Sequence, residues 1–271
     1  MRKPIIFVLL TLSFTYLLHG ILAVRLLYGD AGFYDFSSIV LFTLGGATPT
    51  VFAVVLILAS RNRKEKRRFW ASLVSFKHRV RHWMFALLIP PIIGAGFLIV
   101  YAIGRAEPPT LTNAWYWYFY FLAYSLVVGG LEEVGWRGYL QEKLQGSMPL
   151  IVVALLVGIV WALWHAPLLF IAGNGQALVT MIPYLVGLFM FSLFITYLYA
   201  RTGSLFLAIV FHASINATRR MTNFRIVWEP SLITYSLIGA FTFIGIILMW
   251  RVQHPAMLTW KDKTQYAKQA S

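Results

Sequence analysis

The sequence predicts an all-α, polytopic integral membrane protein, a bundle of about eight transmembrane helices. Of its 271 residues, 59% are hydrophobic and 12% are charged, whereas a soluble domain carries about 25% charged residues. The mean hydropathy is +0.72, and apolar runs near the roughly 20 residues that cross a bilayer recur along the chain. Since no repeat or soluble segment separates these runs, we expect a single membrane domain over residues 1–271.

Eight apolar segments are expected to form the spans. They are roughly 4–27, 37–60, 83–104, 113–131, 149–172, 178–200, 203–218 and 231–250. The first follows Arg2 and Lys3 as a signal peptide would, but it has no convincing small-residue cleavage site. We therefore expect it to be a retained transmembrane helix.

The basic residues predict the orientation of the chain. The loop 61–68 is strongly cationic, and placing it in the cytoplasm puts both termini there as well, as the positive-inside rule requires. All but five of the 23 Lys and Arg then lie on the cytoplasmic side; the exceptions are Arg25, Arg105, Arg219, Arg220 and Arg225. The net charge of +14 therefore indicates contact with anionic membrane lipid, and we expect no nucleic-acid partner. The absence of cysteine excludes thiolate chemistry and any Cys-ligated metal.

Paired carboxylates mark the first candidate site. Glu132 and Glu133 follow the uncharged run Trp115–Gly130, and a carboxylate near membrane depth normally faces a protein interior or a water-filled cavity. On a helix Glu133 and Arg137 lie four residues apart and can pair, whereas Glu132 points about 100° away. We therefore expect a supporting ion pair, Glu133 with Arg137, and a free carboxylate at Glu132. A surface ion pair at a helix end is the simpler alternative.

Two later segments each carry a histidine. His165 is the one ionisable residue of 149–172 and follows Trp161 by four positions, while His212 and Asn216 are four apart in 203–218. Side chains four apart share a helix face. His165 can be a hydrogen-bonded packing residue, and His212 and Asn216 can bond a neighbouring helix, but ionisable residues inside a membrane more often serve function. His19 is a further membrane histidine outside these motifs.

A glutamate, two histidines and an asparagine can activate water and stabilise a tetrahedral oxyanion, which is the chemistry of peptide-bond hydrolysis. We place this catalytic core within 113–220. Other protease signatures, namely His-Glu-x-x-His, Gly-x-Gly-Asp and Gly-x-Ser-x-Gly, do not occur in the sequence. A proton-coupled transporter is the rival prediction from another class, but it would favour an internal repeat.

The ordered set Glu-Glu-x-x-x-Arg, aromatic-x-x-x-His and His-x-x-x-Asn, each on a successive membrane segment, resembles the CPBP family. These are the CAAX-processing and bacteriocin-processing (Abi) intramembrane proteases. The resemblance covers Glu132 to Asn216 and implies about eight helices with the motifs in the later half. One departure is visible: the second motif usually begins with Phe, and Trp161 stands there. We expect this to alter the shape of the pocket without abolishing activity.

The resemblance implies a role for each motif residue. Glu132 resembles the water-activating glutamate, His165 would help to polarise the water, and His212 and Asn216 would hold the oxyanion. Zinc bound by Glu132, His165 and His212, with Asn216 as a further donor, and a metal-free glutamate mechanism both agree with these residues. The implied partners are membrane lipid and a membrane-associated substrate: a prenylated peptide or protein, a bacterial peptide, or a regulatory membrane protein. We expect the protein to lie in a prokaryotic plasma membrane. A catalytically inactive immunity or scaffold protein of the same family is a third functional alternative.

Overall fold

The structure is a computed structural model that describes residues 2–29, 31–105, 111–171, 173, 181–222 and 232–253. These residues form helices and no strand, so the predicted all-α class is confirmed. The long helices are α1 (Arg2–Tyr28), α2 (Phe36–Ala59), α4 (Val80–Arg105), α8 (Leu150–His165), α9 (Met181–Thr202), α10 (Leu205–Met221) and α12 (Leu232–Gln253). The shorter ones are α3 (Arg63–Leu73), α5 (Trp117–Val127), α6 (Glu133–Gly135) and α7 (Glu142–Leu144), with 3₁₀-helices η1 (Gly130–Glu132) and η3 (Ala166–Phe170) and π-helix η2 (Trp136–Gln141).

All eight expected segments contain a helix, but they differ in length. Within the described residues, six helical stretches are long and apolar enough to cross a membrane, and the one beginning at Leu150 continues through η3 to Phe170. The other two are α5, which has 11 residues, and α10, which has 17. The expected span 113–131 is therefore divided: its helix ends at Val127, and η1 starts a separate, irregular segment.

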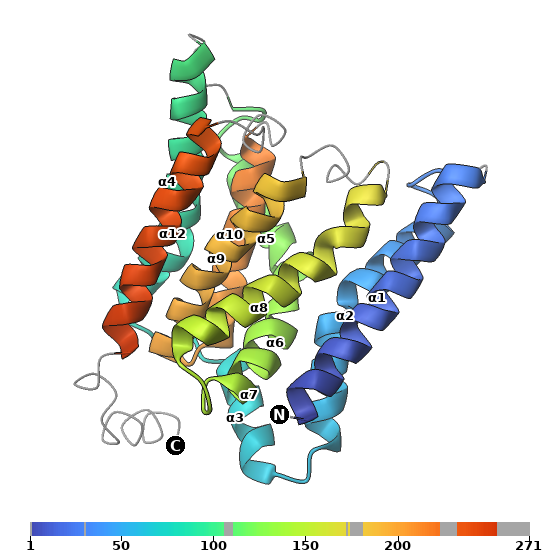
Figure 1. The fold of residues 1–271 in the computed structure, drawn as a ribbon, viewed down its shortest axis with the longest axis vertical. Coiled ribbons are helices and arrows are strands. Elements are labelled where there is room, and N and C mark those ends of the chain that lie inside the picture. The colour runs from blue at the N-terminus through green and yellow to red at the C-terminus, as the bar shows by residue number, and fades with distance from the viewer. Residues whose placement is uncertain are drawn as a thin grey trace.

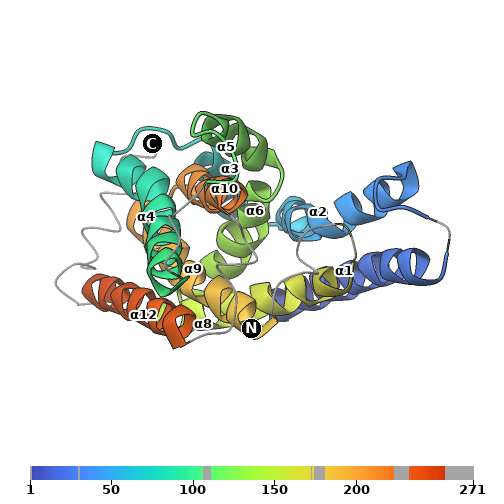
Figure 2. The ribbon, with the colours of Figure 1, turned by 90° about the horizontal axis from the view of Figure 1, so that it is seen from above.

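Helix α10 lies at the centre of the bundle. It packs against α4, α5, α6 and α9, while α12 covers α9 and α8 lies beside α9 (Figures 1 and 2). Helices α1 and α2 pair with each other and extend away from this bundle, contacting it through α8, η3 and the segment from η1 to η2. The side chains of α10 are accordingly buried over most of its length, which places His212 in the protein interior.

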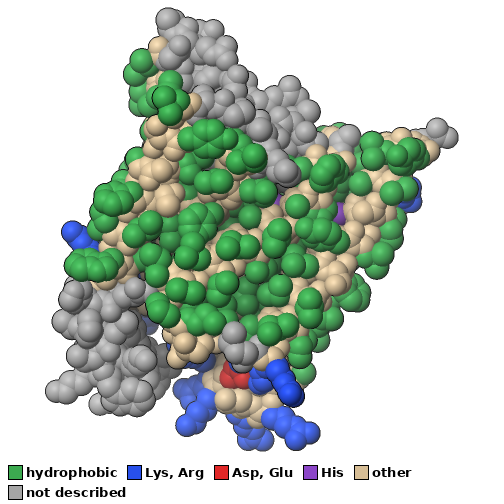
Figure 3. Space-filling view, in the orientation of Figure 1, with side chains coloured by type: hydrophobic (Ala, Val, Ile, Leu, Met, Phe, Trp, Pro, Cys, Tyr) green, Lys and Arg blue, Asp and Glu red, His purple; other side chains and the backbone are tan. Residues whose placement is uncertain are grey.

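The periphery of the bundle is apolar. Large hydrophobic side chains are exposed on most of the outer helices, including Leu9, Val55, Phe119 and Phe243, and they cover much of the face seen in Figure 3. Exposed apolar surface of this extent marks contact with another apolar phase. Together with the six long helices, it shows an integral membrane protein.

The basic helix α3 lies at the same end of the bundle as the first residues of α1 and the last described residues of α12 (Figure 1). Asn62 caps α3, its Oδ1 accepting from Lys64 N (3.0 Å) and Glu65 N (3.2 Å), and Phe69 is buried beneath it. Lys and Arg side chains gather at this end (Figure 3); that this end faces the cytoplasm stays a prediction. Arg225, one of the basic residues expected on the opposite side, lies outside the described residues.

The irregular segment from η1 to α7 is held close to α2. A Cβ at Gly135 would stand 2.6 Å from Pro49 O and 2.7 Å from Pro49 Cβ, so only glycine fits between the two backbones. Thr50 adds a hydrogen bond from its Oγ1 to Leu131 O (2.6 Å). Helix α2 therefore fixes the position of the segment that carries the paired glutamates.

Gly135→Ala should lower stability by about 1–3 kcal/mol, because its methyl group would press against backbone that cannot move independently. The matched control is Gly46→Ala in α2, where an added Cβ meets nothing within 4 Å; we expect it to leave stability unchanged or to raise it by about 0.5–1 kcal/mol. Thermal unfolding of the detergent-solubilised protein measures both. Equal effects of the two substitutions would contradict this packing.

Candidate active site

The three sequence motifs meet around one indole ring, that of Trp161 on α8. Its Nε1 donates to Glu132 Oε2 at 3.0 Å, and its ring centre lies 5.5 Å from that of His165 and 5.3 Å from that of His212. Arg137 Cζ stands 5.4 Å from the same ring, a cation–π distance. The structure therefore brings together residues that are up to 80 positions apart in the sequence (132 to 212).

Glu133 is the centre of a buried ionic network. Its Oε2 lies 2.9 Å from Arg137 Nη1, with both side chains fully buried, and its Oε1 accepts from His212 Nδ1 at 2.7 Å. The predicted pair of Glu133 and Arg137 is confirmed in geometry, but the backbone beneath it passes from a single α turn into π-helix η2, where the sequence suggested one regular helix. Both carboxylate oxygens of Glu133 are engaged by these partners.

Arg137 is held from its far side by α9. Its Nη2 donates to Ser192 Oγ (3.1 Å) and Ser192 O (3.4 Å), and Ser192 Oγ donates in turn to Ala154 O on α8 (3.1 Å). The guanidinium therefore links η2 to α8 and α9. An isolated buried charge is very costly, and these contacts compensate that cost.

Glu132 differs from Glu133 in its position, its exposure and its partners. It lies at the end of η1, it remains partly accessible, and the hydrogen bond from Trp161 engages one oxygen. No ion pair to Glu132 occurs in the described part of the chain. The division predicted from helix geometry, one carboxylate committed and the other available, is present in the structure.

His165 is buried at the end of α8 with its tautomer fixed. Its Nδ1 lies 2.9 Å from Trp161 O, and because a carbonyl can only accept, this nitrogen carries the hydrogen. In the neutral ring Nε2 then has a free lone pair. Aromatic rings enclose the imidazole: Trp164 at 4.6 Å and Tyr184 at 5.8 Å between centroids.

His212 and Asn216 converge on one glycine. Gly129 has φ +106° and turns the chain after the end of α5. A Cβ at this position would lie 2.3 Å from Asn216 Nδ2 and 3.4 Å from His212 Nε2. Both polar groups therefore point to the same side of the turn that precedes Glu132. The sequence spacing predicted that they share a face, and the structure adds the point at which they meet.

The donor atoms do not form a metal site as they are placed. Glu132, His165 and His212 offer the oxygen and nitrogen donors that zinc accepts, yet no three histidine or acidic side chains among the described residues are grouped closely enough to hold a metal ion. The contact of His212 Nδ1 with Glu133 leaves Nε2 open, as in a metal-ligating histidine. The spacing of the three side chains, and not this contact, therefore disfavours a metal site.

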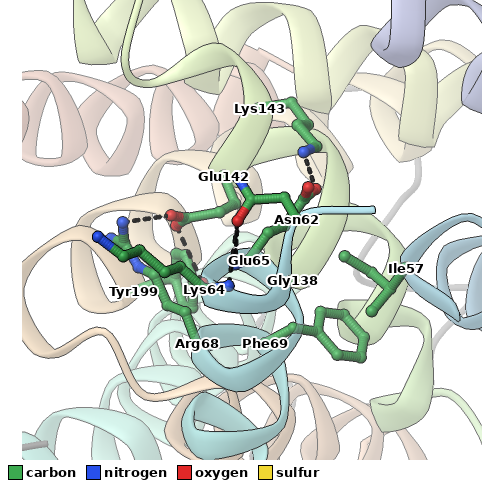
Figure 4. A pocket seen from close by; sticks show the side chains of 10 residues that line it. All are labelled: Ile57, Asn62, Lys64, Glu65, Arg68, Phe69, Gly138, Glu142, Lys143 and Tyr199. Atoms are coloured by element: carbon green, nitrogen blue, oxygen red, sulfur yellow. Dashed lines mark hydrogen bonds and ion pairs between the residues drawn. The ribbon is translucent and has the colours of Figure 1, made fainter. Parts of the chain in front are cut away.

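A cavity of about 290 Å³ lies beside this site but is not lined by the motif residues. It lies between α3, η2, α7 and α9 (Figure 4), where Arg68 Nη1 meets Glu142 Oε1 at 2.9 Å, Lys143 pairs with Glu65, and Tyr199 Oη donates to Glu142 Oε2 at 3.2 Å. Burial raises the pKa of the Glu142 carboxyl above its ordinary value, against the opposing charge of Arg68. These ion pairs tie the basic helix to the segment that follows η2.

Some contributors were not identified from the sequence. Ser192 lies in the expected span 178–200, which contains no charged residue, although a serine in an apolar span is a recognisable signal for a buried hydrogen bond. The indole N–H of Trp161 and the positive φ of Gly129 depend on tertiary geometry. His19 does not join the site: its Nε2 faces Phe42 O at 3.1 Å between α1 and α2.

Comparison with known proteins gives two matches. Residues 114–218 match the family described as type II CAAX prenyl endopeptidase Rce1-like. A protein of Methanococcus maripaludis named CAAX prenyl protease 2 is 26% identical over 190 residues, which cover 65% of this chain and 70% of that protein. The matched region contains all three motifs, so the family resemblance is confirmed.

Glu133→Gln should destabilise the protein by about 3–5 kcal/mol, because Arg137 would remain buried without its carboxylate. Glu132→Gln should cost less than about 1 kcal/mol, since an amide oxygen can still accept from Trp161. Thermal unfolding in detergent measures the loss of stability caused by each of these two substitutions. The double variant Glu133→Leu with Arg137→Met should recover part of the loss, and equal losses at 132 and 133 would contradict the assignment.

Proposed function

We propose that the chain is a CAAX-type membrane endopeptidase, like the proteins it resembles, and that Glu132 activates the water that cleaves its substrate. The observation that carries this proposal is the contrast between the two glutamates. Glu133 is paired with Arg137 and His212 and fully buried, whereas Glu132 has no ion pair among the described residues and remains partly accessible. Only the second can exchange a proton with a bound water.

The proposed reaction begins when Glu132 removes a proton from water as the water oxygen attacks the scissile carbonyl carbon. The carbonyl π bond breaks and its oxygen becomes an oxyanion. When the oxyanion collapses, the C–N bond breaks, and the proton held by Glu132 passes to the leaving amine. General base catalysis of this kind contributes about 10²–10⁴-fold.

His165 is proposed to orient the water. With its hydrogen on Nδ1, its Nε2 lone pair accepts a hydrogen bond from water, and the aromatic rings around it exclude bulk solvent. Trp161 lies between His165 and Glu132 and contacts both. The same water can therefore be held by a histidine and a glutamate from two different helices.

His212 and Asn216 are proposed to stabilise the oxyanion. The Asn216 amide donates through Nδ2, and His212 donates through Nε2 when the ring is protonated. Donors aimed at developing charge in a site of low dielectric typically contribute about 10²–10³-fold each.

The substrate is proposed to be a membrane-associated protein with a prenylated C-terminal tail. The relative from Methanococcus is named as a prenyl protease, and the CAAX motif carries its lipid on a cysteine near the C-terminus. The apolar periphery of this bundle lets such a lipid reach the site without leaving the bilayer. Hydrolysis would release the short tail beyond the lipidated cysteine.

Glu132→Gln should reduce cleavage of a prenylated reporter peptide by at least about 10²-fold, while its unfolding temperature stays near that of the wild type. Glu142→Gln serves as the control, because this partly buried carboxylate lines the cavity and lies outside the motif cluster, and the substitution should leave turnover within about threefold of the wild type. Cleavage is followed by chromatography of the released tail. Full activity of Glu132→Gln, or proton-coupled uptake that survives it in vesicles, would contradict the proposal.

Trp161→Phe should retain activity but move the acid limb of the pH–rate profile to higher pH. The indole N–H stabilises the charged form of the Glu132 carboxylate, and a phenyl ring keeps the aromatic wall without that donor. Glu132 then holds its proton to higher pH and acts as a base over a narrower range. An unchanged acid limb would show that the hydrogen bond from Trp161 has no effect on the titrating group.

A further inference from the structure

Arg219 lies on the face of α10 that carries the proposed oxyanion donors. It follows His212 by seven positions and Asn216 by three, and residues at these spacings share one helix face. Arg219 is partly buried. Arg219 is also one of the five basic residues expected on the side opposite to the cytoplasm. The positive-inside rule disfavours a cation there, so orientation of the chain does not explain its presence.

The surroundings of Arg219 are those of the site. It lies within electrostatic reach of Tyr184 and Glu132, and His165 in turn lies within reach of Arg219. Tyr184 is buried and contacts the His165 ring at 5.8 Å between centroids. The charge of Arg219 therefore acts on residues of the motif cluster.

The adjacent arginine points elsewhere. Arg220 is exposed, and its Cζ lies over the rings of Phe121 and Tyr124 on α5, at 5.7 and 5.1 Å from their centroids. The two arginines are adjacent on the same helix and carry the same charge. Arg220 packs on the rings of α5, whereas Arg219 interacts with residues of the motif cluster. This makes Arg220 a matched control.

We propose that Arg219 binds the C-terminal carboxylate of the substrate tail. This inference rests on the proposed function and adds the group that the enzyme recognises at the tail's end. An arginine pairs with a carboxylate through two parallel hydrogen bonds, and a carboxylate brought to membrane depth is costly unless it is paired in this way. The pairing therefore selects free C-termini over internal segments of a chain.

The spacing along α10 fits a short tail. Seven helical residues rise about 10.5 Å from His212 to Arg219, and three extended residues span about 10–11 Å. Because helical side chains tilt toward the N-terminus together, this axial separation is kept approximately at their polar ends. A scissile carbonyl at His212 therefore places the carboxylate of a three-residue tail level with Arg219.

Two reporter peptides test the inference, both ending in a prenylated cysteine followed by three residues, one as the free acid and the other as the C-terminal amide. Wild-type protein should cleave the acid with a kcat/KM about 10- to 100-fold higher, the range expected of a charged hydrogen bond. Arg219→Gln should reduce the acid to the rate of the amide and leave the amide unchanged. Arg220→Gln should preserve the preference, and Arg219→Lys should retain part of it.

Each result has one meaning. Equal cleavage of acid and amide by the wild type would overturn the role of Arg219 while leaving the protease activity established, and so would an Arg219→Gln variant that slows both peptides equally. Cleavage of neither peptide by the wild type would overturn the proposed function and this inference with it. As a second measurement, lengthening the tail by two residues should abolish the preference of the wild type, because the carboxylate then passes Arg219 by about 7 Å.

Discussion

The buried ionic contact of Glu133 with Arg137 and His212 is the constraint on which the rest of the site depends. It joins η2 to α10, and through Ser192 it extends to α9 and α8. Burying such a network costs free energy, and the protein is strongly destabilised when one member of the network is removed. Its value here is positional: it fixes the imidazole of His212 through Nδ1 and leaves Nε2 facing the turn at Gly129.

The irregular backbone between Val127 and Glu142 allows adjacent glutamates to have different roles. A 3₁₀ turn, one α turn and a π-helix follow one another, and π-helical turns occur frequently at functional sites. Irregular backbone at membrane depth is tolerated only where protein or a water-lined cavity surrounds it. Packing against α2 and α10 provides that enclosure. Within it Glu133 is fully buried and Glu132 remains partly accessible.

The motif residues and the ion pair could be predicted because charges in an apolar sequence are rare and because i, i+4 spacing survives local changes in helix type. Glu133 and Arg137 meet although their backbone is not a regular helix. The early end of α5, the donor role of the Trp161 indole and the contact of Ser192 could not be predicted in this way. Each depends on how helices distant in sequence approach one another, which periodicity does not encode.

Metal content measured beside cleavage separates the proposed mechanism, in which Glu132 activates water by itself, from one that depends on zinc. The detergent-purified wild type would be analysed for bound zinc and assayed with a prenylated reporter peptide on the same sample, together with His165→Ala. If Glu132 acts by itself, wild-type protein that contains far less than one metal ion per chain should cleave the peptide, and a chelator should leave the rate unchanged. Near-stoichiometric zinc that is lost together with activity in His165→Ala would contradict this mechanism.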